Sequence, residues 1–282
     1  MLAPGLSAMA EKENEKLATF QFEGSEKLRY KTTGEAMLHL HVFKPDDWQA
    51  EDSRAGIVFF FGGGWVGGNP GQFEPHCKYL ASRGMVAITA EYRVKSRHNT
   101  GPFECVADGK SAVRWVRAHA KDLGINSNLI AAGGGSAGGH VASATGTTKG
   151  LDEPGDDLSI SSRPNALILF NPVYNNGPGE WGHEKVKERY QEISPAHNIR
   201  PGMPPAIVFL GTEDSLIKVA VAEEFKSKME RVGSKSELHL YDGAAHGFFN
   251  HGRNGNKYYL DTVRKMDKFL NSLGYLNGKP TL

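Results

Sequence analysis

The stretch Leu129-Ile-Ala-Ala-Gly-Gly-Gly-Ser-Ala-Gly-Gly-His140 joins a short apolar run to a run of small residues. Within it, Gly134-Gly-Ser-Ala-Gly138 matches the pattern G-x-S-x-G. Between a strand and a helix, this pattern is typical of a nucleophile elbow, a sharp turn that presents a serine hydroxyl at the top of a sheet. The stretch therefore predicts that Ser136 is a nucleophile at the carboxyl end of a strand.

The glycines of this chain allow a second interpretation. Of 34 glycines among 282 residues, six lie between Gly62 and Gly71 and five between Gly133 and Gly139. Both clusters follow apolar runs and match G-x-G-x-x-G, the fingerprint of a dinucleotide site. Glu91 would then be the ribose-binding acid, although it lies 29 residues after Gly62, more than the usual spacing of about 20. An NAD(P)-binding oxidoreductase is thus an alternative.

Two downstream residues favour the elbow. Asp214 follows the apolar run 206–210, and His246 follows the run 237–241. The order Ser, Asp, His, each after a strand, is that of an α/β-hydrolase, and a dinucleotide-binding chain has no reason to supply it. A serine hydroxyl needs a base within hydrogen-bond reach. We therefore expect Ser136 to be the nucleophile, His246 the base and then the acid, and Asp214 the group that orients His246.

Other residues compete for two of these roles. Asp242 could act in place of Asp214, and the histidines that compete with His246 are His140, His183 and His251. The position of His246 directly before Gly-Phe favours it. A peptidase or amidase can use the same three residues.

The rest of the chain alternates strand-like and helix-like stretches. Strands are predicted at 28–30, 36–43, 55–61, 85–90, 129–132, 166–170, 206–210 and 237–241, and helices at 72–82, 103–120, 137–145, 216–231 and 258–273. The first two strands predict an antiparallel edge hairpin, and the others a mostly parallel twisted sheet with helices on both faces, an α/β fold. We expect a polar N-terminal arm at 1–26, one domain at 27–282, and a small cap insertion at about 174–204.

Composition and charge exclude several other classes of protein. With 33 basic and 32 acidic residues the formal charge is +1, and no basic block indicates a nucleic-acid partner. No apolar run approaches the roughly 20 residues that cross a bilayer, so we expect no membrane partner. Cys77 and Cys105 are too few for a disulfide framework or a zinc site, and we expect both to be buried.

The N-terminal residues leave the compartment open. Ala8-Met9-Ala10 matches a signal-peptidase site, but no positively charged region or apolar stretch precedes it, as a signal peptide requires. The match is either chance or the remnant of a clipped signal peptide. The protein is expected to be extracytoplasmic only in the second case, and its oligomeric state is left open.

With these residues in view, the sequence resembles the hormone-sensitive-lipase-like group of α/β-hydrolases, which includes bacterial acetyl and carbohydrate esterases. The resemblance runs from about 56 to 269 and rests on Gly62–Gly64, Glu91-Tyr-Arg93, Asp108, Gly135-Ser-Ala-Gly-Gly-His140, Asp214 and His246-Gly-Phe248. It implies a serine ester hydrolase that works through an acyl-enzyme without metal or cofactor. It also assigns the oxyanion hole to the backbone N–H groups of Gly63, Gly64 and Ala137.

One residue departs from that family. Phe61 stands where the oxyanion loop usually has a histidine, which puts in question the hydrogen bonding that holds the loop in place. A non-catalytic ligand-binding protein on a hydrolase scaffold is therefore another alternative. Arg93 and Asp108 are expected to pair or cap near the crevice.

The insertion limits the substrates that we expect. It spans about thirty residues and contains no long apolar flap, which favours short-chain acyl esters of soluble alcohols, including acetylated or feruloylated carbohydrate, over lipid substrates. Three aromatic residues allow two interpretations, a sugar-stacking surface or the core of the cap: Trp65, Tyr174 and Trp181.

Overall fold

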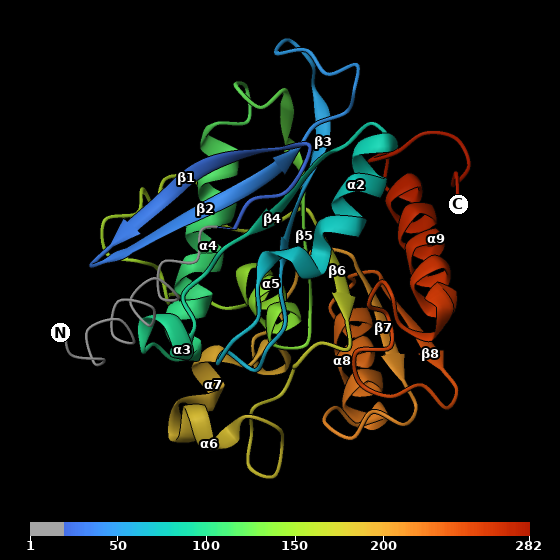
Figure 1. The fold of residues 1–282 in the computed structure, drawn as a ribbon. Coiled ribbons are helices and arrows are strands. Elements are labelled where there is room, and N and C mark those ends of the chain that lie inside the picture. Colours follow the sequence, from blue (N-terminus) through green and yellow to red (C-terminus); the bar gives the residue numbers. More distant parts are fainter. Residues whose placement is uncertain (1–19) are drawn as a thin grey trace, which may run out of the picture.

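The computed structural model describes residues 20–282, and Figure 1 shows its fold. Most of the arm expected at 1–26, and the whole Ala8-Met9-Ala10 match, lie outside the described residues. A strand already begins at Ser25.

An eight-stranded sheet runs through the molecule in the order β1-β2-β4-β3-β5-β6-β7-β8. β1 and β2 form an antiparallel hairpin, β2 pairs antiparallel with β4, and every other pair is parallel. The expected edge hairpin and mostly parallel sheet are confirmed. The strands are β1 (Ser25–Thr33), β2 (Ala36–Phe43), β3 (Arg54–Phe60), β4 (Val86–Ala90), β5 (Ile125–Gly135), β6 (Ala166–Phe170), β7 (Ala206–Gly211) and β8 (Ser236–Tyr241).

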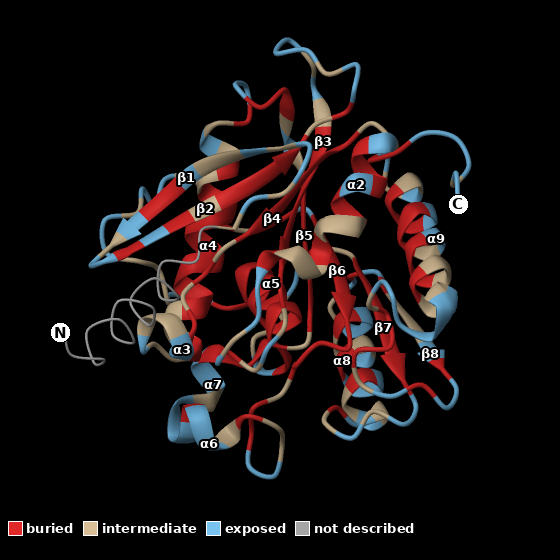
Figure 2. Ribbon diagram, viewed as in Figure 1, coloured by how far each residue is buried: buried red, intermediate tan, exposed pale blue. Residues whose placement is uncertain are grey.

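Helices bury both faces of this sheet, as Figures 1 and 2 show. Along β3, Val58 and Phe60 pack into one apolar cluster, while Ile57 and Phe59 pack into the other. Successive strand residues point to opposite faces, so a continuous apolar run suits a strand that is covered twice. The helices of the first cluster are α4 (Pro102–Ala118), α5 (Ala137–Thr147) and α8 (Val219–Arg231), and those of the second are α2 (Glu74–Ser82) and α9 (Lys257–Ser272).

The connections contain short helices that the sequence pattern did not predict. α3 (Lys95–His98) follows β4, and the segment 174–204 contains α6 (His183–Val186) and α7 (Tyr190–Ile193). Each is four residues long, too short to show a helical period. The 3₁₀ turns are η1 (Pro70–Phe73), η2 (Lys187–Arg189), η3 (Pro195–His197) and η4 (Asn254–Asn256).

The cysteines and the helices bear on what composition predicted. Cys77 and Cys105 are free thiols and both are buried, as expected. Among the helices described within 20–282, none combines the length and apolar character needed to cross a bilayer.

Candidate active site

Ser136 lies in the sharp turn between β5 and α5. Its backbone has φ +54° and ψ −122°, a strained conformation for a residue with a side chain. The glycines around it allow the turn to pack. A Cβ on Gly138 would lie 2.1 Å from the Phe60 carbonyl oxygen, and one on Gly134 would lie 2.4 Å from the Gly138 carbonyl oxygen. The turn therefore has the strained strand-to-helix geometry of a nucleophile elbow.

Ser136, His246 and Asp214 come together at the carboxyl ends of parallel strands. His246 Nε2 lies 2.9 Å from Ser136 Oγ, and His246 Nδ1 lies 2.7 Å from Asp214 Oδ2. The Asp214 side chain is fully buried, whereas 22% of the His246 side chain is exposed. The other oxygen of Asp214 accepts the N–H groups of Leu216 and Ile217, both at 2.9 Å. Backbone donors thus hold the carboxylate toward the histidine.

The competing residues lie in other surroundings. Asp242 is exposed, and its Oδ1 lies 3.4 Å from the Thr212 hydroxyl. His183 Nδ1 lies 2.8 Å from the Asn176 backbone oxygen, within the segment 174–204. His140 and His251 pack edge-on against aromatic rings. The hydrogen-bonded chain to Ser136 therefore runs through His246 and Asp214.

Asn171 is part of this site and was missed in the sequence. It follows β6, is fully buried and has φ +33°. Its Oδ1 accepts the Gly247 N–H at 3.0 Å, and its Nδ2 lies 3.4 Å from His246 Nε2. Asn171 therefore supports the backbone beside His246. Its place at the carboxyl end of a parallel strand was the one signal that could have found it.

The glycine loop after β3 lies beside the elbow. A Cβ on Gly62 would lie 3.4 Å from Ser136 Cβ, and Gly63 and Gly64 have φ values of +133° and +65° that favour glycine. Within the part of the chain that the structure describes, the N–H groups of Gly63, Gly64 and Ala137 make no intramolecular hydrogen bond. These are the three donors assigned to the oxyanion hole.

Phe61 does not leave this loop unsupported. Its ring is buried and stacks on Tyr92 at a centroid distance of 4.2 Å, and the Tyr92 hydroxyl donates to the Phe61 carbonyl oxygen at 2.5 Å. Burial raises the pKa of Tyr92 well above its usual value, so the hydroxyl keeps its proton and remains a donor. Gln72 Oε1 accepts the Gly62 N–H at 2.6 Å. Hydrogen bonds therefore hold the loop although the histidine is absent.

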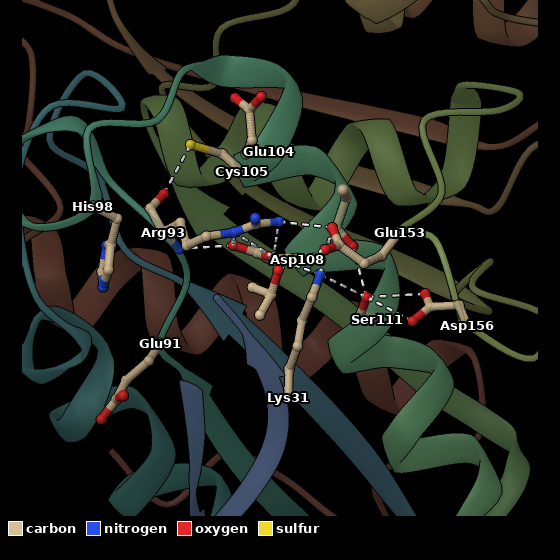
Figure 3. A network of polar contacts seen from close by, with 12 residues as sticks. Lys31, Glu91, Arg93, His98, Glu104, Cys105, Asp108, Ser111, Glu153 and Asp156 are labelled. Carbon is tan, nitrogen blue, oxygen red and sulfur yellow. Dashed lines mark hydrogen bonds and ion pairs between the residues drawn. The ribbon is translucent and has the colours of Figure 1, made fainter. Parts of the chain in front are cut away.

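Arg93 and Asp108 pair as expected, in the network that Figure 3 shows. The Arg93 guanidinium lies 2.8 Å from Asp108, whose side chain is fully buried, and Lys31 Nζ lies 2.6 Å from the same carboxylate. Glu153 accepts from both cations, at 2.7 Å from Arg93 and 2.9 Å from Lys31. Two cations and two carboxylates thus fix β1, α4 and the chain after β4 to one another.

The three aromatic residues considered for a sugar surface are not equivalent. Trp65 and Tyr174 are 1% and 0% exposed, and Tyr174 stacks on Phe225 of α8 at 4.4 Å. Their burial favours the core interpretation for both. Trp181 is half-buried, and its ring carbons lie 3.6 and 3.8 Å from the place where a Cβ on Gly64 would be. The Trp181 ring also packs against Trp65 at a centroid distance of 5.1 Å, and Lys185 Nζ lies 4.7 Å from it. Trp181 is therefore the most exposed of the three aromatic residues and lies beside the glycine loop.

Comparison with known proteins adds independent findings. Residues 40–168 match the BD-FAE family and residues 187–273 the dienelactone hydrolase family. Among curated proteins, the chain is 28% identical to the probable carboxylic ester hydrolase LipM of Mycobacterium tuberculosis, covering 70% of this chain and 50% of that one. It is 26% identical to an acetylxylan esterase of Xylanibacter ruminicola, covering 82% and 48%. The chain thus spans about half the length of these curated relatives.

Solved structures match over nearly the full length of both chains. The propionate-bound structure of esterase 2 from the planctomycete Thermogutta terrifontis is 45% identical, with a TM-score of 0.88, covering 91% of this chain and 97% of that one. The same esterase phosphorylated by paraoxon is 46% identical, with a TM-score of 0.88, covering 92% and 98%. With this identity and a shared α/β-hydrolase fold, the chain belongs to the family of esterases that includes Thermogutta terrifontis esterase 2.

Proposed function

We propose that the chain is a serine carboxylic-ester hydrolase whose catalytic residues are Ser136, His246 and Asp214. The observation that carries this proposal is the pair of short contacts that link Ser136 Oγ to His246 Nε2 and His246 Nδ1 to Asp214. In the productive tautomer, Nδ1–H donates to the carboxylate and the Ser136 hydroxyl donates to Nε2. The histidine can then take the serine proton during attack on an ester, while Asp214 stabilises the imidazolium.

The free backbone donors fit the next requirement of this reaction. Attack of Ser136 Oγ on the ester carbonyl places negative charge on the carbonyl oxygen, and the N–H groups of Gly63, Gly64 and Ala137 would stabilise it. His246 then gives its proton to the leaving alcohol, which departs and leaves Ser136 acylated. A water deprotonated by His246 then attacks the acyl carbon. The second tetrahedral intermediate breaks its bond to Ser136 Oγ, which takes the proton back from His246 as the carboxylic acid is released.

The substrates proposed are short-chain acyl esters, including acetylated carbohydrate. Thermogutta terrifontis esterase 2 has been solved with propionate and with butyrate bound, and one curated relative is an acetylxylan esterase. Of the three aromatic residues considered for a sugar, Trp181 is half-buried and lies beside the glycine loop, whereas Trp65 and Tyr174 are buried. The partner is thus a small-molecule or carbohydrate ester.

No structural observation favours the alternative of a dinucleotide site. The second glycine cluster is packed by the chain itself, because a Cβ on Gly138 would already lie 2.1 Å from the Phe60 carbonyl oxygen. Glu91, considered for a ribose, instead lies 3.1 Å from His39 Nδ1 and 3.0 Å from His41 Nε2. The Phe60 carbonyl oxygen thus fills the space beside Gly138, and the acid considered for the ribose is already paired with two histidines.

The decisive experiment is labelling by a fluorophosphonate probe. The wild-type protein should be labelled at Ser136, Ser136→Ala should not, and Ser227→Ala on the exposed face of α8 should be labelled like the wild type. Ser136→Ala should also lower kcat on p-nitrophenyl acetate by at least about 10⁴-fold. An unlabelled, inactive wild-type protein would reject the esterase proposal. A preference for p-nitrophenyl palmitate over butyrate would reject the short-chain substrate class.

A further inference from the structure

Gln72 connects two loops that are far apart in the sequence. It lies in η1 just after the glycine loop, and its Oε1 accepts the Gly62 N–H at 2.6 Å. Its Nε2 donates to Asn250 Oδ1 at 2.8 Å, across a separation of 178 residues. Asn250 Nδ2 in turn donates to the Gly247 carbonyl oxygen at 2.8 Å. A continuous hydrogen-bonded chain thus runs from the glycine loop to the residue after His246.

The direction of both amides is determined by their partners. The Gln72 oxygen faces a backbone donor and its nitrogen faces an acceptor, while the Asn250 nitrogen faces the Gly247 carbonyl oxygen. Turning the Gln72 amide over would bring its NH₂ group against the Gly62 N–H, and turning Asn250 over would place two oxygens together. The pair therefore has one satisfied arrangement, which specifies the distance between the two loops.

This series of hydrogen bonds begins next to the reacting groups. Gly62 directly precedes Gly63 and Gly64, and a Cβ on it would lie 3.4 Å from Ser136 Cβ. At the other end, Gly247 follows His246, and its N–H is held by Asn171. Phe61 offers no side-chain hydrogen bond to the loop, so Gln72 holds the first of its three glycines through a side-chain amide.

We propose that Gln72 and Asn250 are positioning residues, which hold the oxyanion donors in register with His246 and act mainly on the transition state. This inference rests on the proposed esterase function. A displaced donor binds the transition-state oxyanion less well but hardly affects binding of the ground-state ester. Breaking these hydrogen bonds should therefore lower kcat and leave KM nearly unchanged. Since both residues belong to one connected set of hydrogen bonds, the effects of the two substitutions on kcat should not add.

The test compares Gln72→Met, Asn250→Ala and the double variant on p-nitrophenyl butyrate. Methionine preserves the volume of Gln72 while removing both of its hydrogen bonds. We expect kcat to fall about 10- to 100-fold in Gln72→Met and less in Asn250→Ala, with KM changed less than about threefold, because removing an oxyanion donor outright costs about 10²–10³. The double variant should resemble Gln72→Met. Exposed residues provide matched controls, Gln49→Met and Asn128→Ala, which should leave kcat unchanged.

A second readout separates positioning from loss of structure. A trifluoromethyl ketone forms a tetrahedral adduct whose oxygen occupies the oxyanion site, so its inhibition constant should rise in step with the loss of kcat/KM. Multiplicative effects of the two variants, or a rise in KM with kcat unchanged, would overturn the inference while leaving the esterase proposal intact. An inactive and unlabelled wild-type protein would instead reject the proposed function itself.

Discussion

At the residue scale, hydrogen bonds fix both oxygens of the Asp214 carboxylate. One oxygen accepts two backbone N–H groups and the other faces His246 Nδ1 at 2.7 Å. Since the side chain is fully buried, no solvent competes for these contacts. The competing acid, Asp242, is exposed, and its carboxylate accepts a hydrogen bond from the Thr212 hydroxyl instead.

Replacing Asp214 with asparagine should separate shape from charge. The amide preserves the volume of the side chain but favours the wrong tautomer of His246, so kcat on p-nitrophenyl acetate should fall by about 10⁴-fold. The control Asp242→Asn should keep wild-type kcat. The assignment of the acid is wrong if Asp242→Asn loses activity and Asp214→Asn retains it.

At the element scale, the edge hairpin is fixed to α4 by buried charge. Asp108 of α4 lies within 2.8 Å of Lys31 on β1 and of Arg93 after β4, and their side chains are no more than 11% exposed. Buried ions stabilise a fold only while their charges stay balanced. The network also fixes the chain next to Tyr92, whose hydroxyl supports the glycine loop.

Neutralising Asp108 should therefore destabilise the whole domain. Asp108→Asn leaves Lys31 and Arg93 with Glu153 as the remaining carboxylate of this network, and we expect the free energy of unfolding in urea to fall by about 3 kcal/mol. The matched control is Glu192→Gln, which breaks an exposed pair with Arg189 and should leave the urea midpoint unchanged. An unchanged midpoint for Asp108→Asn would show that the network does not stabilise the fold.

At the scale of the whole molecule, two buried histidines couple stability to pH. Burial lowers the pKa of His76 to about 3 and that of His140 to about 4. In the unfolded chain both would titrate near 6.5. Below pH 6.5, therefore, the unfolded state binds protons that the folded state does not, and stability falls as the pH drops from there toward the folded-state pKa values, by up to about 1.4 kcal/mol per pH unit for each histidine.

His76→Phe should weaken this pH dependence. The ring of His76 lies 4.9 to 6.2 Å from those of Phe73, Phe170, Phe249 and Tyr259, so phenylalanine suits the site. Between pH 7 and pH 5, the variant should lose less unfolding free energy than the wild type, by roughly 1–2 kcal/mol. Urea unfolding at the two pH values measures this difference. An unaltered slope in His76→Phe would contradict the assignment.

Local patterns made most of the sheet predictable from the sequence. Continuous apolar runs such as 55–61 marked doubly covered strands, and alternation at 36–43 marked the edge hairpin. The prediction failed where the pattern is short or polar: β5 begins at Ile125 rather than 129, because Asn126-Ser-Asn128 hides its start. Four-residue helices such as α6 show no period that a sequence pattern could reveal.

The sequence by itself determined the order of the strands and of the five longer helices, the elbow at Ser136, and the candidate residues Asp214 and His246, since apolar periodicity and glycine requirements are local properties of the chain. Only the tertiary structure decided which acid faces the histidine, that Trp65 and Tyr174 are buried, and that Gln72 reaches Asn250. These contacts join residues 32 to 178 positions apart. The distances between these residues depend on which strands lie side by side in the sheet and not on their neighbours in the sequence.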